Sequence, residues 1–526
     1  MKRISLLAGS VAMLLAAATG RVAAQDYVGG RVINAPYVDA GRMLLFSQDD
    51  MTYGTSRTVA MGGAFVSLGA DLSSMGINPA GLGMYQSSDW GITQALSINS
   101  THTGITAPPV SGSFAADGDR VSYGLNNFGA AFNVFNGSKG LTSLTLGFTY
   151  NRAANFNSRT RLRTTGEGAS IADMYARQLD NMVDSGVDAD FLLDDAWSEE
   201  LGAVLGYEAG LVGLGAQGFH SNAGAGPFSS EFSSLTRGGI YEYDFSAGAN
   251  ISNFLYLGAT VSVKEINYHD RTTYGEGSAA GSASLSQEST IDGSGVSAKF
   301  GVVVRPLPAL RIGAAIHLPV LYSLEHDYEG TMRAFDRVRL SESYVETFRT
   351  APRLLVGVSG VVADRAILAL DWEAAWYDRI GLRENTLEAE VASEAASEAA
   401  YKTAHTLRFG FEYLASEATS LRAGAGYMFD FMRPGADGGE AVVGYPTVRS
   451  GYSLSAGVGF NVGERSYVDF AYMFNRARLT PYELYYYERD GQFTAQYSTD
   501  GGRDVPRDYR PLKNMHQITL TLGARF

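Results

Sequence analysis

Large apolar residues alternate with polar or charged ones along much of this chain, and that alternation most constrains its fold. In Thr406–Tyr413 every odd position is large and apolar, while the even positions include Arg408 and Glu412. Leu257–Lys264 and Val468–Phe474 show the same period. Successive side chains of a β-strand point to opposite faces, so each run has one apolar and one polar face. Charged residues do not suit the dry inner face of a soluble sandwich. A transmembrane barrel, apolar toward lipid and polar toward its lumen, accommodates them.

The alternating segments predict the strand number and the topology. About fourteen segments alternate, an even number that returns both ends of the barrel to one side. The connections between them are short and long in turn, the longest lying at about residues 156–240, and short periplasmic turns with long extracellular loops are typical of bacterial barrels. We therefore predict an all-β fold, a transmembrane antiparallel β-barrel formed by residues 86–526. The segments lie near residues 89–99, 123–135, 142–155, 241–251, 255–268, 294–305, 309–325, 342–362, 366–378, 404–414, 419–431, 450–462, 466–478 and 515–526.

The first residues have the features of a secretory signal peptide. Met1–Ala24 has a basic start, an apolar run over Ile4–Thr19 and a small-residue end, which predicts cleavage near Ala24 and Gln25. A retained membrane anchor is the alternative, but the run is short for a helical span. Later in the chain no run approaches 18 consecutive apolar residues. Cysteine is absent, which excludes a lipoprotein anchor, disulfides and thiolate metal sites.

The last residues resemble a terminal barrel strand. Ile518, Leu520 and Leu522 alternate with polar residues, and the chain ends in Phe526. Such an end is the kind recognised by the barrel assembly machinery, which we expect as a partner. We therefore expect a monomeric barrel in the bacterial outer membrane, in contact with outer-membrane lipid.

Residues 25–85 differ in composition from the alternating segments and are predicted to lie partly inside the barrel. Tyr53–Tyr85, here called the hatch, is rich in Gly and Ala, and its charged residues are Arg57 and Asp71. Its small residues allow close backbone approach but cannot form a core of their own. We expect the hatch to fill the lumen, with Gln25–Thr52 as a periplasmic lead into it.

Two short motifs in the hatch resemble a known family. Ala60-Met61-Gly62-Gly63-Ala64, followed by Asn78-Pro79-Ala80-Gly81, resembles the N-terminal hatch of the FadL/TodX family of outer-membrane transporters for hydrophobic compounds. The resemblance is strongest to the Bacteroidetes branch, some members of which are labelled hemin receptors, and Asn151–Asn157 also resembles that branch. The resemblance implies that a hydrophobic substrate is captured among extracellular loops and passes to a pocket beside the hatch. A shift of the hatch then releases it sideways through the wall. Family members handle long-chain fatty acids or aromatic hydrocarbons.

The hatch residues suggest a substrate path. Asn78 is expected to hold a turn through its side chain, Pro79 to rigidify it, and Ala80 and Gly81 to leave no bulk where hatch and wall meet. A static cork is the alternative interpretation. The apolar residues available to an alkyl chain are Phe65, Val66, Leu68, Met75, Ile77 and Leu82.

The long segment at about 156–240 is predicted to contain helices and to take part in substrate capture. Ser170 can cap a helix whose face includes Ile171 and Met174, and a second helix is expected around Trp197–Leu205. Such an amount of apolar surface is unusual for an extracellular loop. Packing on the barrel rim is the alternative. The residues predicted for loop capture are Phe219, Phe228 and Phe232.

Charged residues on the polar face of the predicted strands have two interpretations. They can pair into a network that holds the wall and the hatch together, or they can line a polar channel. They include Lys264, Asp371, Glu373, Arg408, Glu412, Arg422, Asp469 and Arg525.

The sequence argues against several other functions. It has no G-x-S-x-G, H-E-x-x-H or P-loop motif, so we expect no enzyme, and its seven His lack metal-ligand spacing. The net charge of −14 argues against nucleic acid as a partner. We expect no cofactor and predict a passive channel for hydrophobic small molecules, gated by the hatch. The alternatives are a surface adhesin or structural barrel, or a haem-binding receptor. A transporter needs an apolar pocket at Asn78–Gly83, whereas an adhesin does not.

Overall fold

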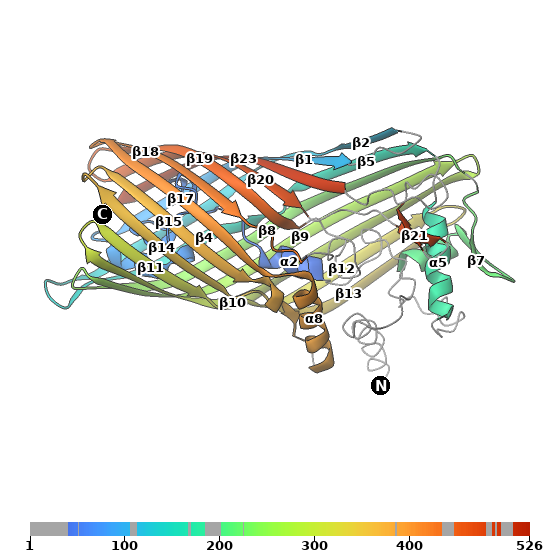
Figure 1. The fold of residues 1–526 in the computed structure, drawn as a ribbon, viewed down its shortest axis with the longest axis horizontal. Helices are drawn as coiled ribbons and strands as arrows, with labels where there is room; N and C mark the ends of the chain where they lie inside the picture. The colour runs from blue at the N-terminus through green and yellow to red at the C-terminus, as the bar shows by residue number, and fades with distance from the viewer. Residues whose placement is uncertain are drawn as a thin grey trace.

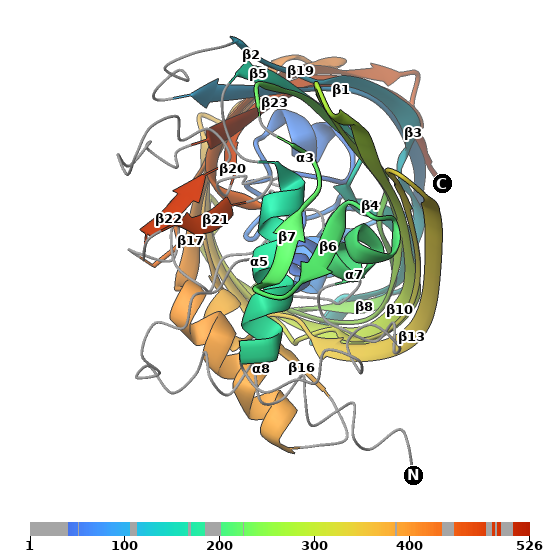
Figure 2. The same cartoon turned by 90° about the vertical axis from the view of Figure 1, so that its right-hand side faces the viewer.

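The chain forms a closed antiparallel β-barrel of 14 strands with its N-terminal segment inside the lumen (Figure 1 and Figure 2). β1 (Asp89–Ile105) closes the barrel because it pairs with β3 (Asp119–Asn136) on one side and with the last strand, β23 (Tyr509–Arg525), on the other. A closed barrel satisfies every strand edge, the condition for crossing lipid without helices. The predicted fold class is confirmed.

The computed structural model describes residues 40–50, 52–105, 113–166, 170–184, 201–224, 226–383, 387–433, 447–479, 486–489, 492–495 and 509–526. The signal peptide predicted at 1–24 and residues 25–39 of the N-terminal extension lie outside these ranges. None of the described helices combines the length and the hydropathy needed to span a membrane.

The wall runs from β1 through neighbouring antiparallel strands to β23. Two wall positions are each made of two strands, interrupted at Pro319 and at Pro352, where proline cannot donate a ladder hydrogen bond. In order after β3, the strands are β4 (Leu141–Asn155), β8 (Phe228–Ile251), β9 (Leu255–Ser278), β10 (Gly281–Leu307), β11 (Leu310–His317) with β12 (Leu321–Arg333), β14 (Arg353–Val362) with β13 (Arg337–Arg349), β15 (Ala366–Trp376), β17 (Thr403–Ser416), β18 (Thr419–Met428), β19 (Val448–Val462) and β20 (Ser466–Leu479).

The two ends of the barrel differ. Short turns, such as those at 252–254 and 363–365, gather at one end together with Phe526, and we call this the short-turn end. The long connections lie at the other, the long-loop end. They carry helices α5 (Ile171–Asp184), α7 (Leu201–Glu208) and α8 (Leu387–Ala400), the 3-10 turn η2 (Tyr377–Arg379), and the short strands β2 (Ser113–Asp117), β5 (Ser158–Gly166), β6 (Val212–Gly215), β7 (Gly218–Ser221), β16 (Gly381–Leu382), β21 (Tyr486–Arg489) and β22 (Gln492–Ala495).

Several segments predicted as long loops continue the wall instead. β9 and β10 remain paired up to Ser278 and Gly281, so the connection expected at 269–293 is a strand extension closed by a tight turn. The segment at about 156–240 likewise contains strand at both ends, because β5 pairs with the first part of β8. Inward apolar side chains of these extensions, including Phe232, Tyr274 and Leu285, pack in one cluster with α5 and α7.

The inward and outward faces of β9 exchange character at one point along the strand. Up to Lys264, the outward residues are apolar, including Leu257 (42% exposed) and Val261 (54% exposed). Beyond that point the outward residues are mostly polar, and the buried, inward residues include the apolar Ile266, Tyr268 and Tyr274 as well as the polar Asp270, Thr272 and Glu276. A lipid-facing strand needs apolar residues outside, and a strand in water needs them inside. The exchange therefore marks the edge of the lipid belt on this strand.

The N-terminal segment crosses the lumen from the long-loop end to the short-turn end. It contains α2 (Ala40–Ser47), α3 (Ser56–Ala60), α4 (Ser74–Ile77) and the 3-10 helix η1 (Pro79–Met84), which leads directly into β1. α2 contacts α8, so residues 40–50 do not form the periplasmic lead that we predicted for Gln25–Thr52. The apolar face of α2 and the carboxylate of Asp49 both find partners inside the lumen.

Candidate functional site

Polar side chains within the hatch fix its shape. Asp71 accepts hydrogen bonds from the Thr55 hydroxyl (2.9 Å) and the Ser73 amide (2.9 Å). Asn78 caps η1, since its Oδ1 accepts from the Ala80 amide at 3.1 Å. Its Nδ2 donates to the Val66 carbonyl at 2.7 Å and lies 3.3 Å from two wall carbonyls. Asn78 therefore holds the turn and also joins it to the wall.

Inward-facing glycines of the wall bring its backbone into contact with the hatch backbone. A Cβ added at Gly258 would lie 2.2 Å from the Pro79 carbonyl carbon, and one at Gly424 would lie 2.1 Å from the Gly62 nitrogen. No side chain fits at such distances, so only glycine allows this approach. We call the group the glycine seat. Its members, each on a different strand, are Gly248, Gly258, Gly313, Gly410 and Gly424, where a Cβ would meet hatch backbone, and Gly301, Gly357 and Gly457, where it would meet hatch side chains.

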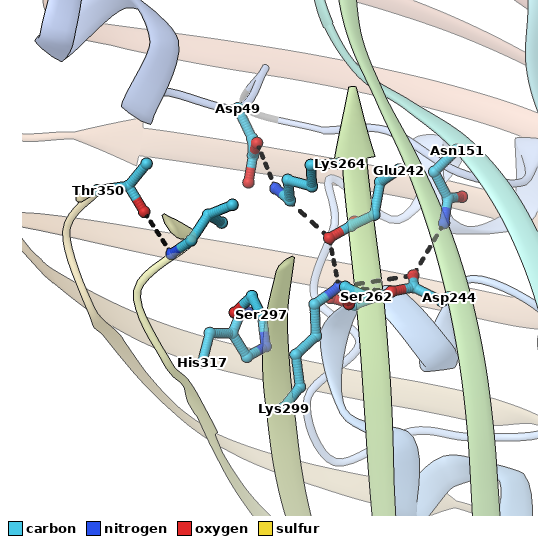
Figure 3. Close-up of polar contacts among 12 residues, drawn as sticks. Asp49, Asn151, Glu242, Asp244, Ser262, Lys264, Ser297, Lys299, His317 and Thr350 are labelled. Carbon is cyan, nitrogen blue, oxygen red and sulfur yellow. Dashed lines mark hydrogen bonds and ion pairs between the residues drawn. The ribbon is translucent and has the colours of Figure 1, made fainter. Parts of the chain in front are cut away.

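Buried ion pairs connect the N-terminal segment to one side of the wall (Figure 3). The Asp49 carboxylate lies 3.0 Å from Lys264 Nζ and 2.6 Å from Arg353 Nη1. Lys264 also lies 3.4 Å from Glu242, whose same oxygen is 2.8 Å from Lys299 Nζ. Lys299 then donates to the Gly76 carbonyl of the hatch at 3.1 Å. The chain of opposite charges therefore reaches both the lead into the hatch and the hatch itself.

A second set of ion pairs holds the hatch on the opposite side. Arg57 of α3 pairs with Glu412 at 2.8 Å, and Arg422 pairs with both Glu412 (2.9 Å) and Asp469. Buried pairs are strongly destabilising when one partner is removed. These contacts match the network interpretation of the lumen charges. Arg525 is outside the network, because it is exposed and its guanidinium lies over the Tyr467 ring.

Above the hatch, toward the long-loop end, apolar side chains of α2 and the wall pack together inside the lumen, and we call this region the upper chamber. α2 occupies it with Met43, Leu44 and Phe46, all buried. The Phe46 ring lies 5.4 Å from Tyr268 and 5.9 Å from Phe156, measured between ring centroids. The wall residues of the chamber are Phe156, Ile240, Ile266, Tyr268, Tyr322, Phe348, Tyr377, Tyr401 and Phe431.

A cavity of about 200 Å³ separates α2 from the hatch. Its lining is mixed. The apolar residues include Leu45, Phe156, Tyr268 and Met428, and the charged residues are Asp49, Asp50, Asp270, Arg353, Glu373, Arg408 and Lys513. Burial raises the pKa of the Asp50 carboxyl to about 6, although the charges of Lys513 and Arg152 oppose that shift. For the adjacent Asp49 burial also acts to raise the pKa, but Arg353 and Lys264 hold it below its ordinary value.

The wall beside this cavity is interrupted. β3 pairs with β4 only as far as Asn127 and Asn151, and pairing resumes between β2 and β5 at Asp117 and Arg161. Residues 118–126 and 152–160 between them form no backbone ladder with each other, and we call this the wall interruption. The side chains that span it include Asn155, whose Nδ2 donates to the Ser122 hydroxyl at 3.1 Å.

The motif Asn155-Phe156-Asn157 ends β4 at the interruption. The Asn155 Oδ1 accepts from the Asn157 amide at 3.1 Å, a local turn that competes with the strand ladder. Phe156 is 7% exposed and packs against Phe46 inside the chamber. The motif therefore breaks the strand and turns an aromatic side chain into the lumen.

The long-loop end is crossed by α5, α7 and the hairpin β6–β7 (Figure 2). The helix expected after Ser170 is present, and Ser170 accepts from the Ala172 amide at 3.0 Å. Phe219 and Phe232 are buried in one apolar cluster with α5 and α7, while Phe228 is buried apart from that cluster. The three loop phenylalanines thus lie in packed contacts rather than on an open surface.

The predicted hatch residues are brought together, but only Ile77 borders the cavity, which does not touch Asn78–Gly83, where the transporter interpretation predicted an apolar pocket. Asn78, Pro79, Ala80, Gly81, Phe65, Leu68 and Leu82 are buried against the wall, whereas Ile77 lines the cavity. The chamber residues of α2 and the upper wall escaped the sequence analysis. The exchange of apolar residues from odd to even positions in the upper strands was the signal that could have identified them.

Comparison with known proteins supports the fold. No protein-family model matches the sequence, and no curated protein matches it significantly. Solved structures do match. The P. putida toluene transporter TodX is 10% identical, with a TM-score of 0.53 over 91% of this chain and 99% of its own. The Ralstonia pickettii toluene transporter TbuX is 13% identical, with a TM-score of 0.51 over 91% and 99% of the two chains.

A third similar structure is a Pseudomonas aeruginosa FadL homologue, 10% identical, with a TM-score of 0.54 over 91% of this chain and 100% of its own. Identities this low establish the fold alone. The chain has the fold of the FadL/TodX-type transporters, as the resemblance of its hatch motifs predicts.

Proposed function

We propose that the protein is an outer-membrane channel through which hydrophobic small molecules enter by passive diffusion. The observation that carries the proposal is the cavity between α2 and the hatch, which has apolar residues in its mixed lining and borders the wall interruption. The similar solved structures include toluene transporters and a FadL homologue, which agrees with this class of ligand.

In this proposal the upper chamber is the ligand site and α2 is its gate. The cavity of about 200 Å³ is below the ~300–1,000 Å³ of usual ligand pockets, so a long alkyl chain fits only when α2 yields. Met43, Leu44 and Phe46 occupy the space that such a chain would fill. The hatch, seated backbone to backbone on the wall, stays in place and blocks the straight path to the periplasm.

The exit in this proposal is the wall interruption. Thr101, Asn155, Phe156, Ser158 and Thr160 line the cavity and lie in or next to the interruption. Polar side chains rather than a backbone ladder hold its two edges together, so opening it breaks few hydrogen bonds. A ligand leaving there passes sideways into the membrane and never crosses the charged hatch network.

A removable crosslink across the interruption tests this function. The chain has no cysteine, so the pair Ser122→Cys and Asn155→Cys forms a unique disulfide where those side chains touch. We expect oxidation to abolish uptake of a radiolabelled long-chain fatty acid and of toluene, and reduction to restore it.

The matched control joins Ser246→Cys to Thr260→Cys, whose hydroxyls lie 2.7 Å apart on the intact β8–β9 wall. That disulfide should leave uptake unchanged. Normal uptake through the oxidised Ser122–Asn155 pair would contradict an exit at this place.

A further inference from the structure

Arginines gather on one outer face of the barrel, although the chain as a whole carries a net charge of −14. Strand alternation places the β5 arginines outward, because the intervening Ser158 and Thr160 line the cavity inside. Across β8, Leu235 stands opposite both Arg159 and Arg271, so the arginines of β5 and β9 flank the same row. We call this group the arginine face. Its members are Arg159, Arg161 and Arg163 on β5, Arg237 on β8 and Arg271 on β9.

The arginine face retains an excess of positive charge after its internal ion pairs are counted. Glu231 lies 3.3 Å from Arg161 and 3.2 Å from Arg163, and Glu288 lies 2.7 Å from Arg271. These two carboxylates pair with three of the five guanidinium groups, and Asp117, opposite Arg161 in the β2–β5 register, brings the carboxylates to three. Within the described part of the chain, Arg159 and Arg237 make no ion pair. Both are exposed, and the Arg163 side chain is 58% exposed.

The arginine face begins just beyond the lipid belt. Tyr150 and Tyr241 stack on the same side of the wall with ring centroids 6.1 Å apart, and tyrosines of this kind mark the edge of the apolar layer. Arg237 precedes Tyr241 by four residues in β8, which is roughly 13 Å along the strand. Because the strand is tilted by about 45°, Arg237 lies roughly 9 Å above the tyrosine rings, at the outer edge of the lipid headgroup layer. The β5 arginines continue the same face farther from the belt.

We propose that the arginine face binds the phosphate groups of the glycolipid that forms the outer leaflet of the bacterial outer membrane. Guanidinium groups bind phosphate with two parallel hydrogen bonds, and clusters of exposed cations at headgroup depth attract anionic lipid. This inference rests on the proposed outer-membrane location, with the long-loop end outward. One edge of the wall interruption is β5 itself, so a glycolipid held there would border the proposed exit.

The test compares two triple variants of the full-length protein purified in detergent. In one, Arg159, Arg161 and Arg237 are replaced by Gln, which removes charge but keeps a polar side chain. In the control, Arg333, Arg337 and Arg339 are replaced by Gln. These are also exposed, one of them is also paired with a glutamate, and they lie at the far end of β12–β13. Heat-dependent electrophoretic mobility checks that both variants fold.

The probe is purified lipopolysaccharide, with enzymatically dephosphorylated lipopolysaccharide and phosphatidylglycerol as comparisons. We expect the first variant to bind phosphorylated lipopolysaccharide at least about tenfold more weakly, with a shallower dependence on salt, and the control to bind as the unmodified protein does. Equal loss in both variants would overturn the inference. So would equally tight binding of the dephosphorylated glycolipid, or displacement by an equal concentration of inorganic phosphate.

Binding in detergent does not depend on transport, so the two proposals fail separately. If the unmodified protein takes up no hydrophobic substrate but binds the glycolipid, the channel proposal fails and the arginine face stands. Intact uptake with unchanged binding in the first variant would refute the arginine face alone.

Discussion

The lower and upper halves of the lumen are filled by the same N-terminal segment in two different ways. In the lower half the hatch touches the wall backbone to backbone at the glycine seat, and ion pairs fix it on opposite sides. In the upper half α2 touches the wall through side chains, and a cavity remains beneath it. Side chains can change rotamer and fill a space in several ways, whereas backbone contacts at van der Waals distance cannot.

This difference indicates which part can move. Displacing the hatch would separate the contacts of eight wall glycines at once, together with the buried ion pairs that would then lose a partner. Displacing α2 exposes apolar side chains, but an incoming apolar ligand can cover the same surface. The comparison therefore assigns anchoring to the lower half and exchange with ligand to the upper half.

The largest effect is expected from Gly258→Leu, which places a side chain where the Pro79 backbone lies. Overpacking of this kind costs about 3 kcal/mol or more, so we expect little folded barrel or a strong leak of small polar antibiotics. Gly275→Leu on the same strand is the control, since a Cβ there meets nothing within 4 Å. Folded yield and antibiotic sensitivity are the measurements. Normal folded yield and normal antibiotic sensitivity of Gly258→Leu would show that the glycine seat does not hold the hatch.

A smaller effect is expected from Phe46→Ala in the upper half, matched by Phe65→Ala in the hatch. Both side chains are buried, and each deletion costs about 3–5 kcal/mol of unfolding free energy. Added long-chain fatty acid should restore the thermal stability of Phe46→Ala, because the ligand refills the chamber, and leave that of Phe65→Ala unchanged. Heat-dependent gel mobility measures the thermal stability. If fatty acid restores the stability of both variants equally, the two halves of the lumen do not differ in this way.

Asp49 and Asp50 show the same contrast at adjacent positions. Both line the cavity, but ion pairs with Lys264 and Arg353 anchor Asp49, whereas burial governs the pKa of Asp50. The lowered pKa of Asp49 means that its stabilisation is present above its ordinary pKa of 3.8 and is lost as the pH falls below it. The raised pKa of Asp50 means that its ionised form costs stability above about pH 6, and this cost disappears as the pH falls toward 3.8. At pH 7.5 we expect Asp49→Asn to destabilise the protein by about 3–5 kcal/mol and Asp50→Asn to stabilise it.

Thermal denaturation at pH 7.5 and pH 4.5 measures both variants. The gain from Asp50→Asn should shrink at the lower pH. Stabilisation by Asp49→Asn at pH 7.5 would show that the Lys264 and Arg353 pairs do not anchor the lead into the hatch.

The smallest effect is expected from locking the hatch to the wall. The Ser56 hydroxyl of the hatch and the Thr521 hydroxyl of the wall lie 2.9 Å apart, so Ser56→Cys with Thr521→Cys can be crosslinked without adding a side chain to the glycine seat. Oxidation should leave fatty-acid uptake unchanged if the hatch stays seated. Uptake that stops on oxidation and returns on reduction would mean that the hatch moves, and would reverse the roles given to the two halves.

The sequence predicts the barrel well because alternation in a lipid-facing wall is a local signal, readable strand by strand. It also predicts the hatch, because a segment poor in charge and rich in glycine has no other place to be buried. The positions of the wall breaks are predictable only in part. Pro319 and Pro352 lie within the predicted strands 309–325 and 342–362, yet the alternation there concealed that each is two strands.

The upper chamber and the arginine face were not predictable in the same way. α2 is short, and nothing in its own residues says whether Phe46 faces the periplasm or the lumen. The arginine face combines residues from positions 159 to 271, which become neighbours only through the pairing of β5, β8 and β9. Arginines separated in the sequence of an acidic chain can be identified as a cluster only when the register of these strands is known.

The glycine seat also sets an order of events during assembly. The hatch runs directly into β1, and β1 is joined to β23 by the pairing that closes the barrel. Once that seam has formed, the ring of wall backbone leaves no clearance for the hatch to slide into place past side chains. We therefore expect the hatch to be laid against the growing sheet before the last strand arrives, so that β23 completes the closure around a lumen that is already filled.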